Sequence, residues 1–80
     1  MTQELIDALI AKYNADIIIA RTNLNNYFKN SVGVGEHPNI VNECDKLVDA
    51  IATAEGKVES LRKLVESFRK LQNESSNNRK

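Results

Sequence analysis

Apolar side chains recur every seven residues on both sides of a single break in the chain. The only proline and two of the three glycines lie within residues 33–38, and Gly56 is the remaining glycine. Because glycine and proline are the strongest breakers of regular structure, this segment predicts one turn near the middle of the chain. The stretches before and after the turn contain no proline, and each is long enough for an extended helix.

The spacing of the apolar residues indicates helices and not strands. They alternate in steps of three and four residues, which is typical of an α-helix that buries one stripe. The run Ile17, Ile18 and Ile19 favours a strand locally, but it lies inside the longer helical pattern. The apolar stripes, here called the seam, comprise Ile6, Ile10, Tyr13, Ile17, Ala20, Leu24 and Tyr27 before the turn, and His37, Ile40, Cys44, Leu47, Ile51, Ala54, Val58, Leu61, Val65 and Phe68 after it.

We therefore predict an all-α fold, an antiparallel two-helix hairpin with coiled-coil-like packing. Thr2 is suited to cap the first helix, and Pro38 to stand in the first turn of the second, where its missing N–H costs nothing. In the predicted hairpin, Ile6 faces Leu61, and a large side chain opposes a small one twice, where Leu47 faces Ala20 and Tyr13 faces Ala54. The predicted hairpin spans residues 1–73, with a helix over 3–30, a turn over 31–37 and a helix over 38–73, followed by a flexible polar tail over 74–80.

The apolar surface exceeds what two helices can cover. The second predicted helix is the longer, so its last apolar residues have no partner on the first. A scaffold of 80 residues without a disulfide gains only about 3–5 kcal/mol from one core, and Cys44 is the only cysteine. We expect a homo-oligomer, with a dimer that completes a four-helix bundle favoured and a different protein as the alternative partner. The predicted interface comprises Ile18, Ile19, Phe28, Leu64, Val65, Phe68 and Leu71.

No catalytic, cofactor or metal site is expected. The single histidine and single cysteine supply too few groups for a nucleophile with its base, or for a zinc site within one chain. The two glycines before the second helix invite comparison with a phosphate-binding loop, but no strand precedes them and Glu36 places a negative charge where an anion would bind. A metal held by His37 across a symmetric interface remains a lesser alternative to a capping role. The residues singled out in this turn are Gly33, Gly35, Glu36, His37 and Pro38.

Charge is balanced over the chain but not along it. The 11 basic and 11 acidic residues cancel, which argues against nucleic-acid binding through a global positive field. Residues 57–80 carry seven basic and three acidic residues, whereas the start of the second helix is acidic. This polarity suits the helix dipole; alternatively, it would orient two second helices that lie antiparallel across an interface. Two alternative functions stay open. One is capture of a small anion or nucleotide at an oligomer interface, where several basic ends or several Gly-Glu-His-Pro turns meet, and the other is weak nucleic-acid binding through the basic end.

The segment from Asn26 to Val41, with Val32-Gly33-Val34-Gly35-Glu36-His37-Pro38 at its centre, resembles a group of small uncharacterised proteins of T4-like tailed bacteriophages. Those proteins look like helical hairpins with a Val-Gly-Val-Gly-Glu-His-Pro turn. The similarity extends to about residue 65, and Phe28, Ser31 and Asn39 depart from the pattern. The resemblance implies a phage-encoded protein that acts in the host cytoplasm, and it brings no active site with it.

Together these features predict a non-enzymatic helical interaction protein, a phage accessory factor that oligomerises and binds a host or phage macromolecule. The N-terminus lacks the basic and apolar pattern of a signal peptide, and the longest apolar run, from Ile17 to Ala20, is too short to span a membrane. We therefore expect a cytoplasmic protein without a membrane partner.

Overall fold

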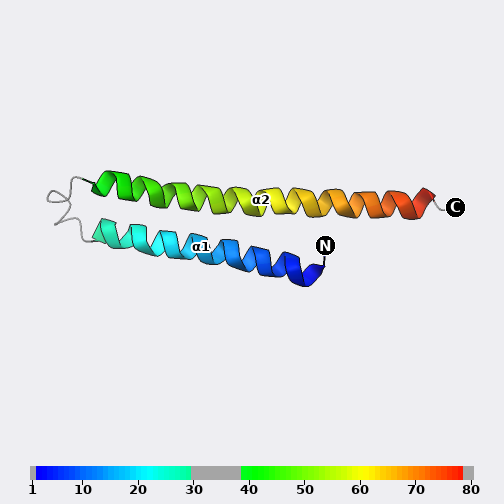
Figure 1. The fold of residues 1–80 in the computed structure, drawn as a ribbon, viewed down its shortest axis with the longest axis horizontal. Coiled ribbons are helices and arrows are strands. Elements are labelled where there is room, and N and C mark those ends of the chain that lie inside the picture. Colours follow the sequence, from blue (N-terminus) through cyan, green and yellow to red (C-terminus); the bar gives the residue numbers. More distant parts are fainter. Residues whose placement is uncertain (1, 30–38, 79–80) are drawn as a thin grey trace.

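The chain forms two long antiparallel helices that lie side by side (Figure 1). The computed structural model describes residues 2–29 and 39–78. Helix α1 spans Gln3–Lys29 and helix α2 spans Ile40–Asn78, which confirms the predicted all-α hairpin. The molecule measures 70 × 18 × 13 Å, and its radius of gyration is 19.4 Å, against about 12 Å for a compact domain of this length. The described residues form a thin rod of two helices.

Helix α1 begins where the sequence predicted, at Gln3, directly after Thr2. The hydroxyl oxygen of Thr2 accepts a hydrogen bond from the Leu5 N–H at 3.3 Å, and its carbonyl accepts one from the Ile6 N–H at 3.1 Å. Glu4 in the first turn and Lys29 in the last turn complement the helix dipole. These contacts satisfy donors that would otherwise be free at the start of the helix.

Helix α2 starts later and ends later than predicted. It begins at Ile40 instead of 38, because Asn39 occupies the capping position, where its carbonyl accepts the Glu43 N–H at 2.9 Å. It continues to Asn78 instead of 73, since residues 74–78 contain no glycine or proline that would stop a helix. The predicted flexible tail is therefore helical as far as Asn78. The predicted turn over 31–37 and Pro38 lie outside the described residues.

The core is the predicted seam between the helices. The four buried apolar residues, Ile6, Ala20, Ala54 and Leu61, all belong to it. The most buried side chains are the two alanines, and small side chains at these positions let the helices approach closely. Phe68 is the exception, with 45% of its surface exposed, because α2 projects past the N-terminus of α1 there (Figure 1). The half-buried members are Ile10, Tyr13, Ile17, Leu24 and Tyr27 on α1, and Ile40, Cys44, Leu47, Ile51, Val58 and Val65 on α2.

Candidate interaction surface

Most residues of the predicted interface are exposed. Ile18 and Ile19 are each 60% exposed, and Phe28, Leu64 and Leu71 are more than half exposed. Val65 is half-buried, because it belongs to the seam and lines the gap between the helices. Three further exposed apolar residues were not part of the predicted interface, namely Leu5, Val41 and Val48. The sequence marked these three residues in the same way as Ile18 and Ile19, because each is an apolar residue that lies outside the seam.

Six of the seven residues of the predicted interface, all except Phe28, fall on two separate surfaces. Successive residues of an α-helix are about 100° apart, so Ile18 and Ile19 point away from the seam residues on either side of them. On α2, by contrast, apolar side chains at helical spacing continue the seam beyond Leu61. We call these residues the C-terminal stripe: Leu64, Val65, Phe68 and Leu71. A single flat partner could not cover both surfaces of one rod.

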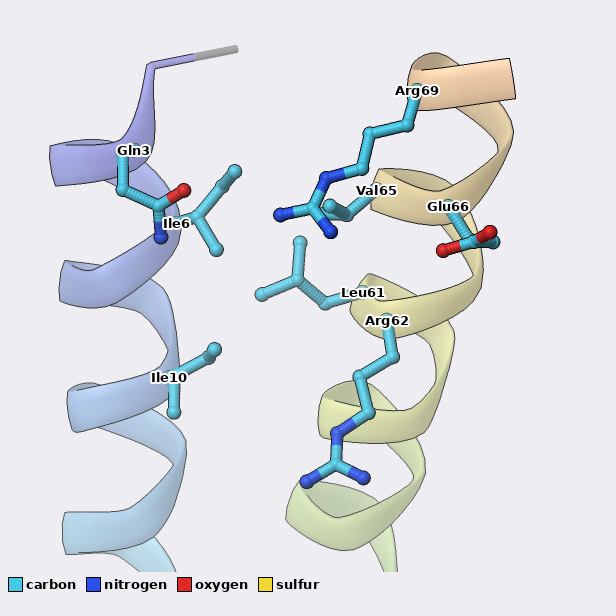
Figure 2. Close-up of a pocket in the computed structure, with 8 residues that line it drawn as sticks. All are labelled: Gln3, Ile6, Ile10, Leu61, Arg62, Val65, Glu66 and Arg69. Carbon is cyan, nitrogen blue, oxygen red and sulfur yellow. The ribbon is translucent and has the colours of Figure 1, made fainter.

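A groove lies between the helices beside the C-terminal stripe (Figure 2). Its volume is about 370 Å³. Ile6 of α1 and Leu61 of α2 point toward each other across it, as the predicted register requires, and Leu61 reaches between Ile6 and Ile10 (Figure 2). The side chains that line the groove are Gln3, Ile6, Ile10, Leu61, Arg62, Val65, Glu66 and Arg69. The groove therefore has an apolar floor formed by both helices.

The rim of the groove is basic. The guanidinium group of Arg69 extends from α2 toward α1, the side chain of Arg62 runs mainly along α2 beside Leu61, and Glu66 stays close to its own helix (Figure 2). Within residues 2–29 and 39–78 the ion pairs are Lys12 with Asp16 and Lys46 with Glu43, each at 3.3 Å and each within one helix. Neither arginine takes part in them. A guanidinium in this position offers two parallel N–H donors to a carboxylate or a phosphate.

One polar contact joins the two helices elsewhere. The ammonium nitrogen of Lys57 lies 5.6 Å from the centre of the Tyr13 ring, within the range of a cation–π interaction. Tyr13 is half-buried on the seam, where the sequence analysis placed it, and it is not among the residues that line the groove. This contact accounts for one of the basic residues of the C-terminal half of the chain as part of the hairpin itself.

The structure shows no binding or catalytic site at the other residues that the sequence analysis considered, within the residues it describes. The turn residues Gly33, Gly35, Glu36, His37 and Pro38 lie outside the described residues. Cys44 is a half-buried free thiol on the seam. In the part of the chain that the structure describes, no three His, Cys, Asp or Glu side chains gather as metal ligands. In the same part, neither helix combines the length and the apolar character that crossing a membrane requires.

The accessible surface is large for a chain of this mass. It amounts to 6481 Å², whereas a folded monomer of 9.0 kDa exposes about 4,850 Å². The excess, about 1,600 Å², follows from the shape, since a pair of helices has no second layer to cover its outer faces. A standard protein interface removes about 800 Å² from each partner. The excess is therefore twice what one such contact would cover.

Comparisons of the chain with protein-family models, with curated proteins and with solved structures found no match.

Proposed function

We propose that this protein is a non-enzymatic helical interaction protein that self-associates, as a dimer in the first instance, and binds a host or phage macromolecule in the cytoplasm. The observation that carries the proposal is the surface excess of about 1,600 Å² over a compact monomer, together with the exposed isoleucines, leucines and phenylalanines that contribute to it. The resemblance of residues 26–65 to small phage proteins supports the phage setting.

Self-association offers the simplest cover for this surface. A second copy carries the same exposed apolar residues, so a two-fold axis places like surfaces against each other without any other component. Two hairpins together form a four-helix bundle, in which each helix has neighbours on more than one side. One standard contact would take half of the excess surface and leave the rest for a further partner.

The basic groove is the part of the surface best suited to a different protein. Its apolar floor, with Leu61 and Val65, continues into the C-terminal stripe, and Arg62 and Arg69 flank it. An amphipathic helix of a partner binds such a groove with its apolar side chains inward. Because the flanking charges are guanidinium groups, we propose that the partner segment carries acidic side chains beside its apolar stripe.

Sedimentation equilibrium tests the first half of this proposal. We expect the mean mass to rise with concentration from one chain toward two. A mass of one chain at every concentration up to about 1 mM, where an association would be worth only about 4 kcal/mol, would contradict self-association.

Charge reversal tests the second half. The double variant Arg62→Glu and Arg69→Glu should abolish binding of partners captured from infected-cell lysate. The matched control is Lys63→Glu and Lys70→Glu, which changes net charge equally but on the outer face of α2. Equal loss of captured partners in both variants, or in neither, would contradict a role for the groove.

A second candidate function is capture of a small anion, such as a nucleotide. Two arginine side chains that line one groove favour it. A nucleotide present at 100 times its dissociation constant should stabilise the fold by about 2.7 kcal/mol, which a thermal-shift series over nucleotides would detect. The absence of a shift with any nucleotide, or an equal shift in the Arg62→Glu variant, would contradict this candidate. Weak nucleic-acid binding through the basic end is distinguished by its decline as salt increases.

A further inference from the structure

The outer faces of the two helices differ in chemistry. The outer face of α2 is charged and polar, with Asp45, Asp49, Lys63 and Lys70 exposed along it. The outer face of α1 is mainly apolar between Leu5 and Thr22, where Leu5, Ala8, Ala11, Ala15, Ile18, Ile19 and Thr22 are exposed together with Lys12 at one edge. Glu4 and Lys29 lie on the same face near the two ends of the helix. Helix α1 therefore has an apolar surface on two opposite sides, one against α2 and one facing away from it.

The outer face of α1 has the repeat of a helix contact. Ala8, Ala11, Ala15, Ile18 and Thr22 follow one another in steps of three, four, three and four residues, as the seam residues do. Ile18 and Ile19, each 60% exposed, are the large side chains on this face. A helix that is apolar on opposite sides is typical of the interior of a bundle, with a neighbour on each side.

We propose that a second copy of this chain covers this face, with the two α1 helices packed antiparallel at the centre of the dimer and the two α2 helices outside. The inference rests on the self-association proposed above and identifies the surface that mediates it. It leaves the basic groove and the C-terminal stripe free for a different partner.

Charge and side-chain size favour the antiparallel arrangement. The acidic residues Glu4 and Asp7 lie near the start of α1, and Lys29 lies at its end. An antiparallel pair that overlaps along the whole helix places Glu4 near the partner's Lys29, whereas a parallel pair places like charges together. The same overlap sets Ala15 opposite the partner's Ile18, so that a small residue faces a large one at both of these related positions.

The available surface is sufficient for such a dimer. Helix α1 has 27 residues and is about 40 Å long, so a full overlap forms one continuous helix contact. A contact of standard size removes about 800 Å² from each chain, which is half of the excess surface of this rod. No rearrangement of the hairpin is needed, because every residue on this face is already exposed.

A matched pair of alanine substitutions tests the surface. Ala15 and Ala52 are both exposed within helices, Ala15 on the outer face of α1 and Ala52 on that of α2. In sedimentation equilibrium we expect Ala15→Glu to raise the dimer dissociation constant at least about tenfold, since it buries a charge in the proposed contact, and Ala52→Glu to leave it unchanged. Circular dichroism of both variants verifies that the helices are intact.

The outcomes separate this inference from the proposed function. If the unsubstituted protein is a dimer and Ala15→Glu dissociates no more than Ala52→Glu, the surface assigned here is wrong while self-association stands. If the unsubstituted protein is a monomer, self-association itself is wrong and this inference falls with it.

Spin-label distances test the orientation. With Cys44→Ala as background, a label at residue 22 is compared with a label at residue 29, seven residues further along the same side of α1. In an antiparallel pair the distance between the two labels of the dimer rises by about 20 Å from the first site to the second, because each label moves about 10 Å in opposite directions. An unchanged distance would overturn the antiparallel arrangement, and a label distance at residue 22 too long for contacting helices would overturn the α1 contact.

Discussion

Leu61 and Leu64 allow the same chemical change to be made at a covered and at an uncovered position of one helix. Leu61 is 6% exposed and points into the seam toward Ile6, whereas Leu64, one turn further on, is 51% exposed. Both substitutions, Leu61→Ala and Leu64→Ala, remove the same atoms from α2 and change helix propensity by the same small amount. Any difference in stability between them therefore reports how much of each side chain the hairpin covers.

The expected magnitudes follow from these exposures. Truncating a buried leucine to alanine costs about 2–5 kcal/mol, and the cost rises with the volume of the cavity that remains. Leu61 borders a groove of about 370 Å³ that is already open, so little new enclosed cavity forms and we expect about 2–3 kcal/mol. Leu64 has half of its surface in water before the change, so its truncation should cost about 1 kcal/mol.

Urea unfolding followed by circular dichroism measures both values. The two variants and the unsubstituted protein are compared at one low concentration, at which the protein is monomeric, so that association does not contribute. We expect Leu61→Ala to lower the free energy of unfolding by at least about 1 kcal/mol more than Leu64→Ala. Equal losses at the two positions would refute the reasoning, because they would mean that Leu64 is covered as well as Leu61 within a single chain.

Other changes have equally specific outcomes. Gly56→Ala should raise the free energy of unfolding by about 0.5–1 kcal/mol, because Gly56 lies within α2 and a Cβ there meets nothing within 4 Å; a lower melting temperature would contradict it. Thr2→Ala should cost about 0.5–1 kcal/mol in urea unfolding through loss of the cap to Leu5, while Thr53→Ala, on the outer face of α2, should cost nothing. Ala54→Leu should destabilise by about 1–3 kcal/mol at a position only 3% exposed, and Ala52→Leu should not. For a dimer that unfolds to two chains, calorimetry should show the melting temperature rising by about 4 °C for each tenfold increase in concentration, and a constant value would contradict dimer formation.

The seam could be predicted from the sequence because one periodic pattern decides it. Ile6, Ala20, Ala54 and Leu61 follow the steps of three and four residues, and all four are buried. The isoleucine run at 17–19 shows how the pattern overrides local preference: Ile17 is half-buried on the seam, while Ile18 and Ile19 remain helical and exposed. Thr2 was predictable for a local reason, since a cap needs only a hydroxyl at the right place.

The bounds of α2 and the division of the exposed apolar residues into two surfaces were harder to predict from the sequence. Pro38 marks a boundary only approximately, and Asn39 takes the capping position one residue later. The polar end of α2 has no apolar periodicity, so the pattern gave no reason to extend the helix to Asn78. The predicted interface grouped Ile18 with Phe68 because the contact between α1 and α2 covers neither of them. A list of uncovered apolar residues does not say on which side of the hairpin each one lies. The position of each residue around its helix, together with the placement of the helices, separates the outer face of α1 from the C-terminal stripe.

The asymmetry between the helices indicates how one small chain can serve two contacts. If surplus apolar surface were distributed at random, both outer faces would carry it, yet the outer face of α2 is charged at Asp49 and Lys63 while that of α1 exposes Ile18 and Ile19. The polar outer face of α2 is therefore stable in water, whereas the apolar outer face of α1 is stabilised by packing against the α1 helix of a second copy. A dimer built through α1 places both α2 helices on the outside, where the groove with Arg62 and Arg69 occurs once on each protomer. Two identical basic grooves on one rigid body would bind a partner with two sites more tightly than either groove alone, because the second contact forms within the complex.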